Sequence, residues 1–240
     1  MIKVAVIGAG PSGITAIKNF IDEGFDVTAF ERCDGVGGNW RFNDPSGHSS
    51  VFETTHIISS KYTSFYEDYP LPDDASDYPS HKELLSYFNG YAEHFNIKKN
   101  IKFGTEVLSC KQLPNGRWLL KYKHLDGNEE ITLEFDALVV CNGHHHVPRY
   151  PQYKGEFTGE FLHSHDYKRA APFENKRVLV IGGGNSACDV AVETSRISQE
   201  TSLSWRRGYH LVPKFMYGLP ADVFAKRSRW IPQFLRIPFM

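Results

Sequence analysis

The sequence predicts an α/β fold in which two strand–turn–helix–strand units flank an inserted three-stranded β-meander. Three observations support this prediction. Two short apolar runs are each followed by a glycine-rich turn and then by apolar residues at helical spacing. Between the two units the apolar period changes to two, which is typical of antiparallel strands. Both units read as Rossmann-like, with parallel strands joined through a helix.

Composition and charge place the chain among ordinary globular proteins. It has 240 residues, 41% of them hydrophobic, and 27 basic against 28 acidic residues give a net charge of −1. These values exclude a disordered or coiled-coil chain. A net charge near zero also argues against non-specific nucleic-acid binding, so no nucleic-acid partner is expected.

Cysteine spacing and the N-terminal sequence favour a cytoplasmic protein. The four cysteines are scattered and form no Cys-x-x-Cys pair, which suits a reducing compartment and predicts neither a zinc site nor a dithiol. An apolar strand begins at Ile2, which leaves no room for a signal peptide. No apolar run approaches the roughly 20 residues of a membrane span, so no membrane partner is expected. A homodimer is left open.

The first unit occupies the N-terminal thirty residues. Lys3–Ile7 is an apolar run typical of a strand covered on both faces. The first glycine turn, Gly8–Gly13, follows, and then isoleucines recur at helical spacing up to Gly24. The second strand, Asp26–Phe30, ends at Glu31.

The middle of the chain combines a long irregular segment, a helix and the meander. Residues 34–77 are too long for a simple connector, so a functional role is expected. Ser80–Glu83 is a capping box that begins an amphipathic helix continuing to Phe95. The predicted meander strands are separated by Pro-Asn-Gly and Asp-Gly turns, and a buried strand follows them. These strands are Phe103–Cys110, Arg117–His124, Glu130–Phe135 and Ala137–Cys141.

The second unit begins after a proline-rich passage. Arg177–Ile181 is the strand, Gly182–Ala187 is the second glycine turn, and a helical stripe leads to the strand Ser202–Trp205. The expected domains are therefore residues 1–168, with the meander at about 101–136, and residues 169–240, incomplete at the C-terminal end. Residues 226–240 are predicted to form a solvated amphipathic helix.

The first glycine turn has the spacing of a dinucleotide-binding site. Free N–H groups at a helix N-terminus stabilise a pyrophosphate, and a β-carbon would block its approach. Gly8 makes the turn, Gly10 admits the phosphates, and Gly13 lets helix and strand pack closely. Glu31, 23 residues after Gly8, can accept hydrogen bonds from ribose hydroxyls. Because its carboxylate would repel a 2′-phosphate, FAD or NAD is expected there.

The second glycine turn differs at the end of its second strand. Arg206 and Arg207 lie 24 and 25 residues after Gly182, and no acidic residue lies there. Two guanidinium groups can hold a 2′-phosphate through charge-assisted hydrogen bonds. This turn therefore predicts NADPH.

A metal site is not expected. His144, His145 and His146 are consecutive, so they cannot all face one ion from a strand, and no carboxylate or thiol lies at ligand spacing.

Together these residues resemble the flavin-containing monooxygenase family, within the class B flavoprotein monooxygenases. The first glycine turn, Glu31-Arg32 and Gly37–Phe42 are similar to its FAD-binding fingerprint. Phe157–Tyr167 fits its pattern Phe-x-Gly-x-x-x-His-x-x-x-Tyr/Phe, in which Baeyer–Villiger enzymes usually carry Trp at the last position. Asn142–His144 resembles its Thr-Gly-His/Tyr linker, with Asn in place of Thr. The similarity covers essentially the whole chain, although family members are much longer.

The resemblance implies an enzyme that uses FAD, NADPH and O2. One oxygen atom would enter a soft nitrogen or sulfur nucleophile, a small amine or sulfide, through a C4a-hydroperoxyflavin. No catalytic acid or base is assigned. The FAD contacts that it implies are Gly8, Gly10, Pro11, Ser12, Gly13, Glu31, Gly38, Asn39, Trp40 and Ser59. The NADPH contacts that it implies are Gly182, Gly184, Asn185, Ser186, Ala187, Asp189, Arg206 and Arg207.

One departure from the family pattern falls beside the expected flavin ring. Ile58, Ser59 and Ser60 are expected there, and the family usually places a flavin-contacting Asn where this chain has Ile58. A branched apolar side chain cannot donate a hydrogen bond, so Ser59 or Ser60 would have to supply any donor.

Three alternatives compete with this interpretation. The first is an NADPH–flavin oxidoreductase that does not oxygenate, and the second is a Baeyer–Villiger monooxygenase, which Tyr167 opposes. The third is a truncated, non-catalytic fragment that binds flavin weakly or only packs against a partner.

Overall fold

The computed structural model describes residues 1–208, 210–227 and 229. Contacts divide them into two compact units. The first comprises Met1–Val51 and His81–Lys154, and the second comprises Phe52–Ser80 with the described residues from Gly155 onward. Each unit therefore combines segments that are distant in the sequence. The expected domain boundary at residue 168, which concerns cofactor binding, stays a prediction.

The first unit is built on a four-stranded parallel sheet with the order β3-β2-β1-β7. The strands are β1 (Lys3–Ile7), β2 (Asp26–Phe30), β3 (Ile101–Lys102) and β7 (Ala137–Val140). In the central strand, Val4, Ala5 and Val6 are fully buried. A parallel strand covered on both faces explains this unbroken apolar run.

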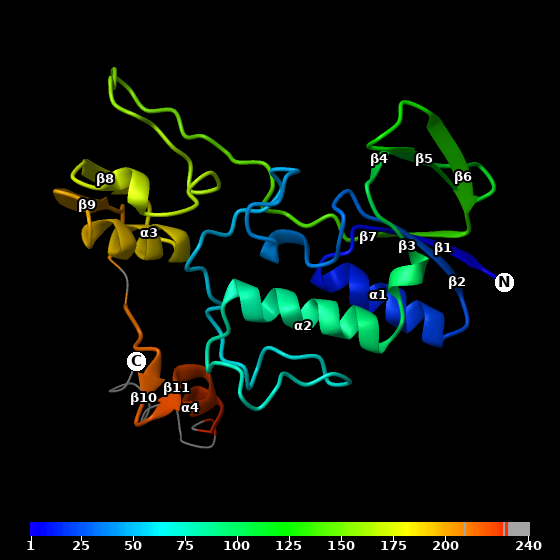
Figure 1. Cartoon of the computed structure of the whole chain (residues 1–240), viewed down its shortest axis with the longest axis horizontal. Coiled ribbons are helices and arrows are strands. Elements are labelled where there is room, and N and C mark those ends of the chain that lie inside the picture. The colour runs from blue at the N-terminus through cyan, green and yellow to red at the C-terminus, as the bar shows by residue number, and fades with distance from the viewer. Residues whose placement is uncertain (209, 228, 230–240) are drawn as a thin grey trace. The chain divides into compact units, whose positions relative to one another are not determined.

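Helices cover one face of this sheet and the meander covers the other (Figure 1). The helices are α1 (Pro11–Asp22) and α2 (His81–His94), with the short η2 (Lys98–Asn100) after them. The meander strands are β4 (Thr105–Gln112), β5 (Trp118–His124) and β6 (Glu130–Phe135). Phe30, Tyr122 and Phe135 join the sheet and the meander in one buried cluster, in which the Phe30 and Tyr122 ring centroids are 4.9 Å apart.

The meander begins later than the sequence pattern predicts. Ile101–Lys102 pairs with β2 in the parallel sheet, and Gly104, at φ +59°, separates it from β4. A bulge between Val107 and Ser109 then shifts the register with β5, and β4 extends to Gln112. A period of two does not distinguish the end of one sheet from the start of another, which explains the difference.

The second unit contains the predicted strand–turn–helix–strand pattern in its shortest form. β8 (Arg177–Ile181) and β9 (Glu200–Ser204) pair in parallel, and α3 (Asn185–Ser195) connects them. Four short elements of the described part of this unit were not predicted: η3 (Ala171–Phe173), β10 (Phe215–Met216), β11 (Leu219–Pro220) and α4 (Ala221–Arg227). Most of the helix predicted over 226–240 lies outside the described residues.

Burial differs between the two parallel sheets. In β8 and β9 burial alternates, and Leu179 and Ile181 are 61% and 50% exposed. Ala191 and Thr194 on α3 cover one face of the pair. Within the part of the chain that the structure describes, no helix combines the length and apolarity needed to span a bilayer.

Candidate dinucleotide sites

The first glycine turn is shaped by the packing of the protein itself at two positions. Gly8 donates its N–H to the Phe30 carbonyl over 2.8 Å, at φ +95°, and a β-carbon there would lie 2.5 Å from the Cys141 carbonyl oxygen. A β-carbon on Gly13 would lie 2.0 Å from the Gly8 carbonyl oxygen. Both distances are far below van der Waals contact. The close approach of helix and strand expected at Gly13 is therefore present.

The packing of the protein does not explain why position 10 is a glycine. It is the N-cap of α1 with an ordinary φ of −71°, and its nearest neighbour for a β-carbon is the Gly38 Cα at 3.5 Å, which is normal contact. α1 has no side-chain cap, and Pro11 at its first position has no N–H. Glycine at position 10 thus leaves open the approach to uncapped helix N–H groups, as an anionic group requires.

The segment with the expected Gly-Asn-Trp motif lies against this turn. Gly38, at φ +53°, begins the short helix η1 (Gly38–Trp40), and a β-carbon on it would lie 3.0 Å from the Gly10 Cα. Gly37 donates its N–H to the Ala9 carbonyl over 3.1 Å. The structure therefore brings together two groups of predicted FAD contacts that are almost thirty residues apart.

Glu31 is a buried acid at the end of β2. It is 7% exposed, one carboxylate oxygen accepts the Ala9 N–H over 2.6 Å, and the other accepts the Cys33 N–H over 2.8 Å. Each oxygen keeps a second lone pair. The carboxylate is thus fixed beside the glycine turn and can still accept hydrogen bonds from a ribose.

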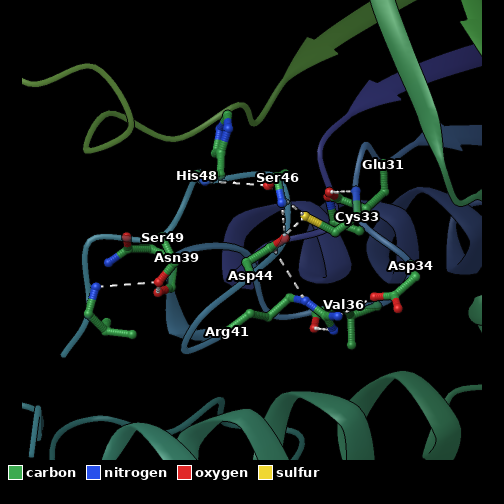
Figure 2. A network of polar contacts seen from close by, with 12 residues as sticks. Glu31, Cys33, Asp34, Val36, Asn39, Arg41, Asp44, Ser46, His48 and Ser49 are labelled. Atoms are coloured by element: carbon green, nitrogen blue, oxygen red, sulfur yellow. Dashed lines mark hydrogen bonds and ion pairs between the residues drawn. The ribbon is translucent and has the colours of Figure 1, made fainter. Parts of the chain in front are cut away.

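A polar network holds the segment that follows Glu31 (Figure 2). Arg41 lies at its centre, where it pairs with Asp34, donates to the Val36 carbonyl and approaches Asp44. A β-carbon on Gly35 would lie 2.5 Å from Arg41 Nη1. The glycine at position 35 therefore makes room for the guanidinium group, which in turn sets the path of the chain towards Gly38.

Cys33 and Asp44 form the buried end of this network. The Cys33 thiol donates to Asp44 Oδ2 over 2.6 Å, and burial followed by this bond raises its pKa to about 12. Burial alone would raise the Asp44 pKa, but hydrogen bonds from Cys33 and Ser46 outweigh burial and lower it. Cys33 is therefore a neutral donor to a carboxylate, not a reactive thiolate.

Asn39 is partly occupied by the protein. Its side-chain oxygen accepts the N–H and hydroxyl of Ser50 over 2.8 and 2.9 Å, and its backbone carbonyl accepts the Ser49 hydroxyl over 2.6 Å. These contacts make Asn39 a brace between η1 and the following segment. Of its side chain, the amide nitrogen has no hydrogen-bond partner among the described residues and is left for the predicted FAD contact.

The consecutive histidines separate into different contacts. The His146 ring stacks on His48 with centroids 4.1 Å apart, while His144 and His145 lie against each other at 3.9 Å. Burial, followed by the nearby His146, lowers the pKa of His48. Among residues 1–208, 210–227 and 229, no group of three or more His, Cys, Asp or Glu side chains could hold a metal ion.

The second glycine turn repeats the backbone hydrogen bond and the helix start of the first. Gly182 donates to the Ser204 carbonyl over 2.9 Å at φ +141°, and Gly184 caps α3 at φ −82° without a side-chain cap. A β-carbon on Gly184 would meet nothing within 4 Å. Asn185 and Ser186 follow as the exposed first residues of α3, with Ala187 and Asp189 half-buried behind them.

The two predicted phosphate-binding arginines lie beyond β9. Arg206 and Arg207 are both exposed, and within the described chain neither forms a hydrogen bond or an ion pair. They lie just after the strand end that pairs with Gly182. Two uncompensated guanidinium groups at this position suit an anionic ligand.

The three residues expected near a flavin ring belong to the second compact unit. Ile58 is 67% exposed, Ser59 accepts a hydrogen bond from the Ser64 hydroxyl over 2.6 Å, and Ser60 is fully buried. These three residues and the first glycine turn therefore belong to different compact units.

The Phe-x-Gly-x-x-x-His-x-x-x-Tyr pattern has a structural reason at both ends. The Phe157 ring folds over Gly159, where a β-carbon would lie 2.4 Å from the ring. Tyr167 is 2% exposed and donates its hydroxyl to Glu193 of α3 over 2.7 Å. Burial is the largest cause that raises the pKa of both Tyr167 and Glu193. The last residue of the pattern thus ties this segment to the helix of the second glycine turn.

Comparison with known proteins places the chain in a family. The sequence pattern of the family described as flavin-binding monooxygenase-like matches residues 1–236. The chain is 41% identical over 239 residues to dimethylaniline monooxygenase [N-oxide-forming] 2 of Cavia porcellus, covering 95% of this chain and 44% of that protein. The chain therefore belongs to the flavin-binding monooxygenase-like family, and the predicted resemblance is confirmed.

Solved structures with the same fold include enzymes of different substrates. S-allyl-L-cysteine S-oxygenase from Allium sativum superposes with a TM-score of 0.80 at 29% identity, covering 90% of this chain and 54% of that one. Cyclohexanone monooxygenase from Rhodococcus sp. Phi1, bound to NADP+, gives 0.68 at 25% identity, covering 88% and 39%. The chain thus spans about half the length of the relatives that it matches.

Sequence reasoning missed the contacts that brace these sites. The Arg41 network, the Tyr167–Glu193 bond and the stacked His48–His146 pair all join residues that no spacing rule connects. Sequence reasoning also missed the helix α4, although a signal for its start was available. Pro220 followed by the acid Asp222 is typical of a helix N-terminus.

Proposed function

We propose that this chain binds FAD and NADPH and takes part in inserting one oxygen atom of O2 into a soft nitrogen or sulfur nucleophile. Membership of the flavin-binding monooxygenase-like family supports this proposal. So do relatives whose names specify N-oxide formation and S-oxygenation. We further infer that each strand–turn–helix–strand unit belongs to a dinucleotide-binding domain.

The observation that carries the proposal is the opposite charge at the ends of two otherwise similar turns. Beside the first turn lies the buried carboxylate Glu31, which favours a ribose with free hydroxyls, as in FAD. Beyond the second lie the exposed Arg206 and Arg207, which favour a 2′-phosphate, as in NADPH. If the residues beside both turns carried the same charge, there would be no reason to expect two different cofactors.

The residues that would hold FAD are in or near the first compact unit's turn. They are Gly8, Gly10, Pro11, Ser12, Gly13 and Glu31, with Gly38, Asn39 and Trp40 opposite them. NADPH would be held by Gly182, Gly184, Asn185, Ser186, Ala187, Asp189, Arg206 and Arg207. When bound, the flavin supplies hydride acceptance and oxygen activation.

The protein's own part in the reaction is binding, orientation and exclusion of water. The Ile58 side chain offers no hydrogen-bond donor and Ser60 is fully buried, so Ser59 is the polar side chain of that segment left to supply one. An apolar side chain at this point would keep water from the flavin face. A small amine or sulfide is the proposed substrate class, because a soft nucleophile needs no side-chain acid or base.

The test is a two-step reaction with the FAD-loaded protein. NADPH is added anaerobically and flavin bleaching is followed, and then O2 is admitted with dimethylaniline or a thioether. The proposal predicts bleaching by NADPH, a transient absorbance after O2 and formation of N-oxide or sulfoxide. It is contradicted by a flavin that NADPH does not bleach, or by complete recovery of the NADPH electrons as hydrogen peroxide with every amine and sulfide offered.

A further inference from the structure

The hairpin β10–β11 and the helix α4 contact the segment Phe52–Ser80, which contains the residues expected near the flavin. Lys214, just before β10, contacts the His56 ring, and its carbonyl accepts a hydrogen bond from the Tyr78 hydroxyl. The Phe215 ring meets the Tyr78 ring edge to face, with centroids 5.5 Å apart. All of these residues belong to the second compact unit.

A second contact with the segment Phe52–Ser80 is made by the carboxylate of Asp222. Asp222, in the first turn of α4, accepts the backbone N–H of Ser60 over 2.8 Å and the Thr63 hydroxyl over 2.6 Å on the same oxygen, Oδ2. Its other oxygen accepts the Val223 N–H over 2.8 Å. Burial would raise the Asp222 pKa, but these hydrogen bonds outweigh burial and lower it. The carboxylate is therefore ionised, and its hydrogen bonds are of the stronger, charge-assisted kind.

These bonds fix a turn that begins at Ser60, two residues after Ile58, and ends at Thr63. Thr63 donates its N–H to the Ser60 carbonyl over 3.1 Å, which closes the turn, while Asp222 holds both of its ends. Ser60 is fully buried at the fixed end, whereas Ile58 is 67% exposed. The packing of Ile58 itself thus does little to place it, and the anchor at Ser60 does more.

We propose that Asp222 is a positioning residue for the segment Ile58–Ser60, so that α4 sets the surface presented to the flavin by a part of the chain more than 150 residues away. The inference rests on the proposed function, since it takes Ile58 and Ser59 to face the flavin while the buried Ser60 anchors them. The hydrogen bonds of Asp222 in the described chain are all to protein groups. It acts through the Ser60 backbone and the Thr63 hydroxyl.

The test compares four variants of the FAD-loaded full chain. Asp222→Asn removes the charge and turns one acceptor into a donor, Thr63→Val removes one hydrogen bond, and Thr63→Ser restores it. Asp126→Asn, in an exposed turn of the first unit, is the matched control for the loss of one acid. Two quantities are measured: the hydrogen-exchange rate of the Ser60 amide, and the fraction of NADPH electrons that ends in hydrogen peroxide.

Asp222→Asn is expected to speed exchange of the Ser60 amide about ten- to a hundredfold, because a charge-assisted bond is lost. Thr63→Val should give a smaller increase, and Thr63→Ser and Asp126→Asn should stay within about twofold of the unchanged chain. The peroxide fraction should rise in the same order, with the KM for NADPH unchanged. A merely structural role would not produce this split.

Two results would overturn the inference. One is a Ser60 exchange rate in Asp222→Asn equal to that in Asp126→Asn. The other is faster exchange with an unchanged peroxide fraction, which would separate the anchor from the flavin. If Asp222→Asn does not fold, the Thr63→Val and Thr63→Ser pair decides by the same two readouts. Failure of the proposed function looks different, because NADPH then fails to bleach the flavin of the unchanged chain.

Discussion

The two glycine turns share one backbone design and differ in what surrounds it. Gly8 and Gly182 each donate to the last carbonyl of the neighbouring strand, over 2.8 and 2.9 Å, and Gly10 and Gly184 each cap a helix without a side-chain cap. The parallel strand pairs have equivalent registers over five residues. The two turns therefore share the hydrogen bond, the helix start and the strand register, although φ is +95° at Gly8 and +141° at Gly182.

The differences lie in packing and charge. At the last position of the turn, Gly13 allows no β-carbon, whereas Ala187 carries one; even a β-carbon added to Gly182 would lie 3.4 Å from it. Beside the first turn lies a buried acid, and beyond the second lie two exposed arginines. The comparison separates glycines that the fold needs from glycines that only a ligand would need, and the predictions below test that separation.

The largest effect is expected at the helix–strand contact. Gly13→Ala places a β-carbon 2.0 Å from the Gly8 carbonyl oxygen, so it should destabilise the fold by about 3 kcal/mol or more. The matched change in the other turn, Ala187→Gly, should cost only about 1 kcal/mol, through backbone entropy. Urea unfolding measures both. Similar losses in the two variants would mean that the two turns are packed alike.

The next effect separates binding from folding. Gly10→Ala fits the protein, because the nearest atom would be 3.5 Å away, and so it should leave the free energy of unfolding of the apoprotein nearly unchanged. It should still weaken FAD binding about a hundredfold by obstructing the phosphates. Gly184→Ala should act on NADPH in the same way and leave FAD binding intact. FAD affinity is measured by flavin fluorescence. An apoprotein destabilised as much as Gly13→Ala would show that Gly10 is a packing glycine.

Arg206→Ala tests the charge beyond the second turn. Because the side chain is exposed and forms no hydrogen bond or ion pair within the described residues, unfolding should change by less than about 0.5 kcal/mol. The KM for NADPH should rise about ten- to a hundredfold, with a much smaller change for NADH. Arg149→Ala, another exposed arginine, is the control. Equal effects on the two nucleotides would remove the 2′-phosphate assignment.

Glu31→Gln tests the acid beside the first turn. The carboxylate accepts N–H groups on both oxygens, and an amide would turn one acceptor into a donor that faces one of them. Stability should fall by about 1–3 kcal/mol, and FAD affinity with it. Glu129→Gln, at an exposed position, should leave both unchanged. Unaltered FAD affinity in Glu31→Gln would show that the carboxylate serves only the protein.

The smallest effect concerns pH. Burial and His146 lower the pKa of His48, so protonation favours the unfolded chain, while Glu31 and Asp44 oppose this. The contribution of neutral His48 is present above its ordinary pKa of 6.5 and is lost as the pH falls below it. His48→Phe keeps a ring for His146 to stack on and removes the titration. Its free energy of unfolding should therefore depend less on pH below 6.5, whereas an identical pH dependence in both proteins would contradict the assignment.

Sequence patterns predicted the regular elements of this fold well, because strands, helices and tight turns follow local rules. The runs before Gly8 and Gly182 became β1 and β8, and the capping box at Ser80–Glu83 began α2. The predicted parallel and antiparallel sheets are both present, although the start of β4 was placed two residues early.

The contacts that brace the candidate sites could not be predicted in the same way. Asp222 meets Ser60, and Tyr167 meets Glu193, only because the chain folds back across long separations. A spacing pattern carries no signal for such pairs. The need for glycine at position 35 could not be predicted either, because it comes from the Arg41 side chain packed over it. Family resemblance predicts which residues contact the cofactors, but it does not predict which residues hold those segments in place.

We expect the first turn to prefer a ribose without a 2′-phosphate and the second turn to prefer a ribose with one. The most direct test of this difference uses nucleotide fragments. FAD-loaded protein is titrated calorimetrically with 2′,5′-ADP and with 5′-AMP, which differ by the 2′-phosphate. We predict one site that binds 2′,5′-ADP at least about tenfold more tightly than 5′-AMP, with no release of FAD. Equal affinities, or displacement of the flavin by either fragment, would contradict the account.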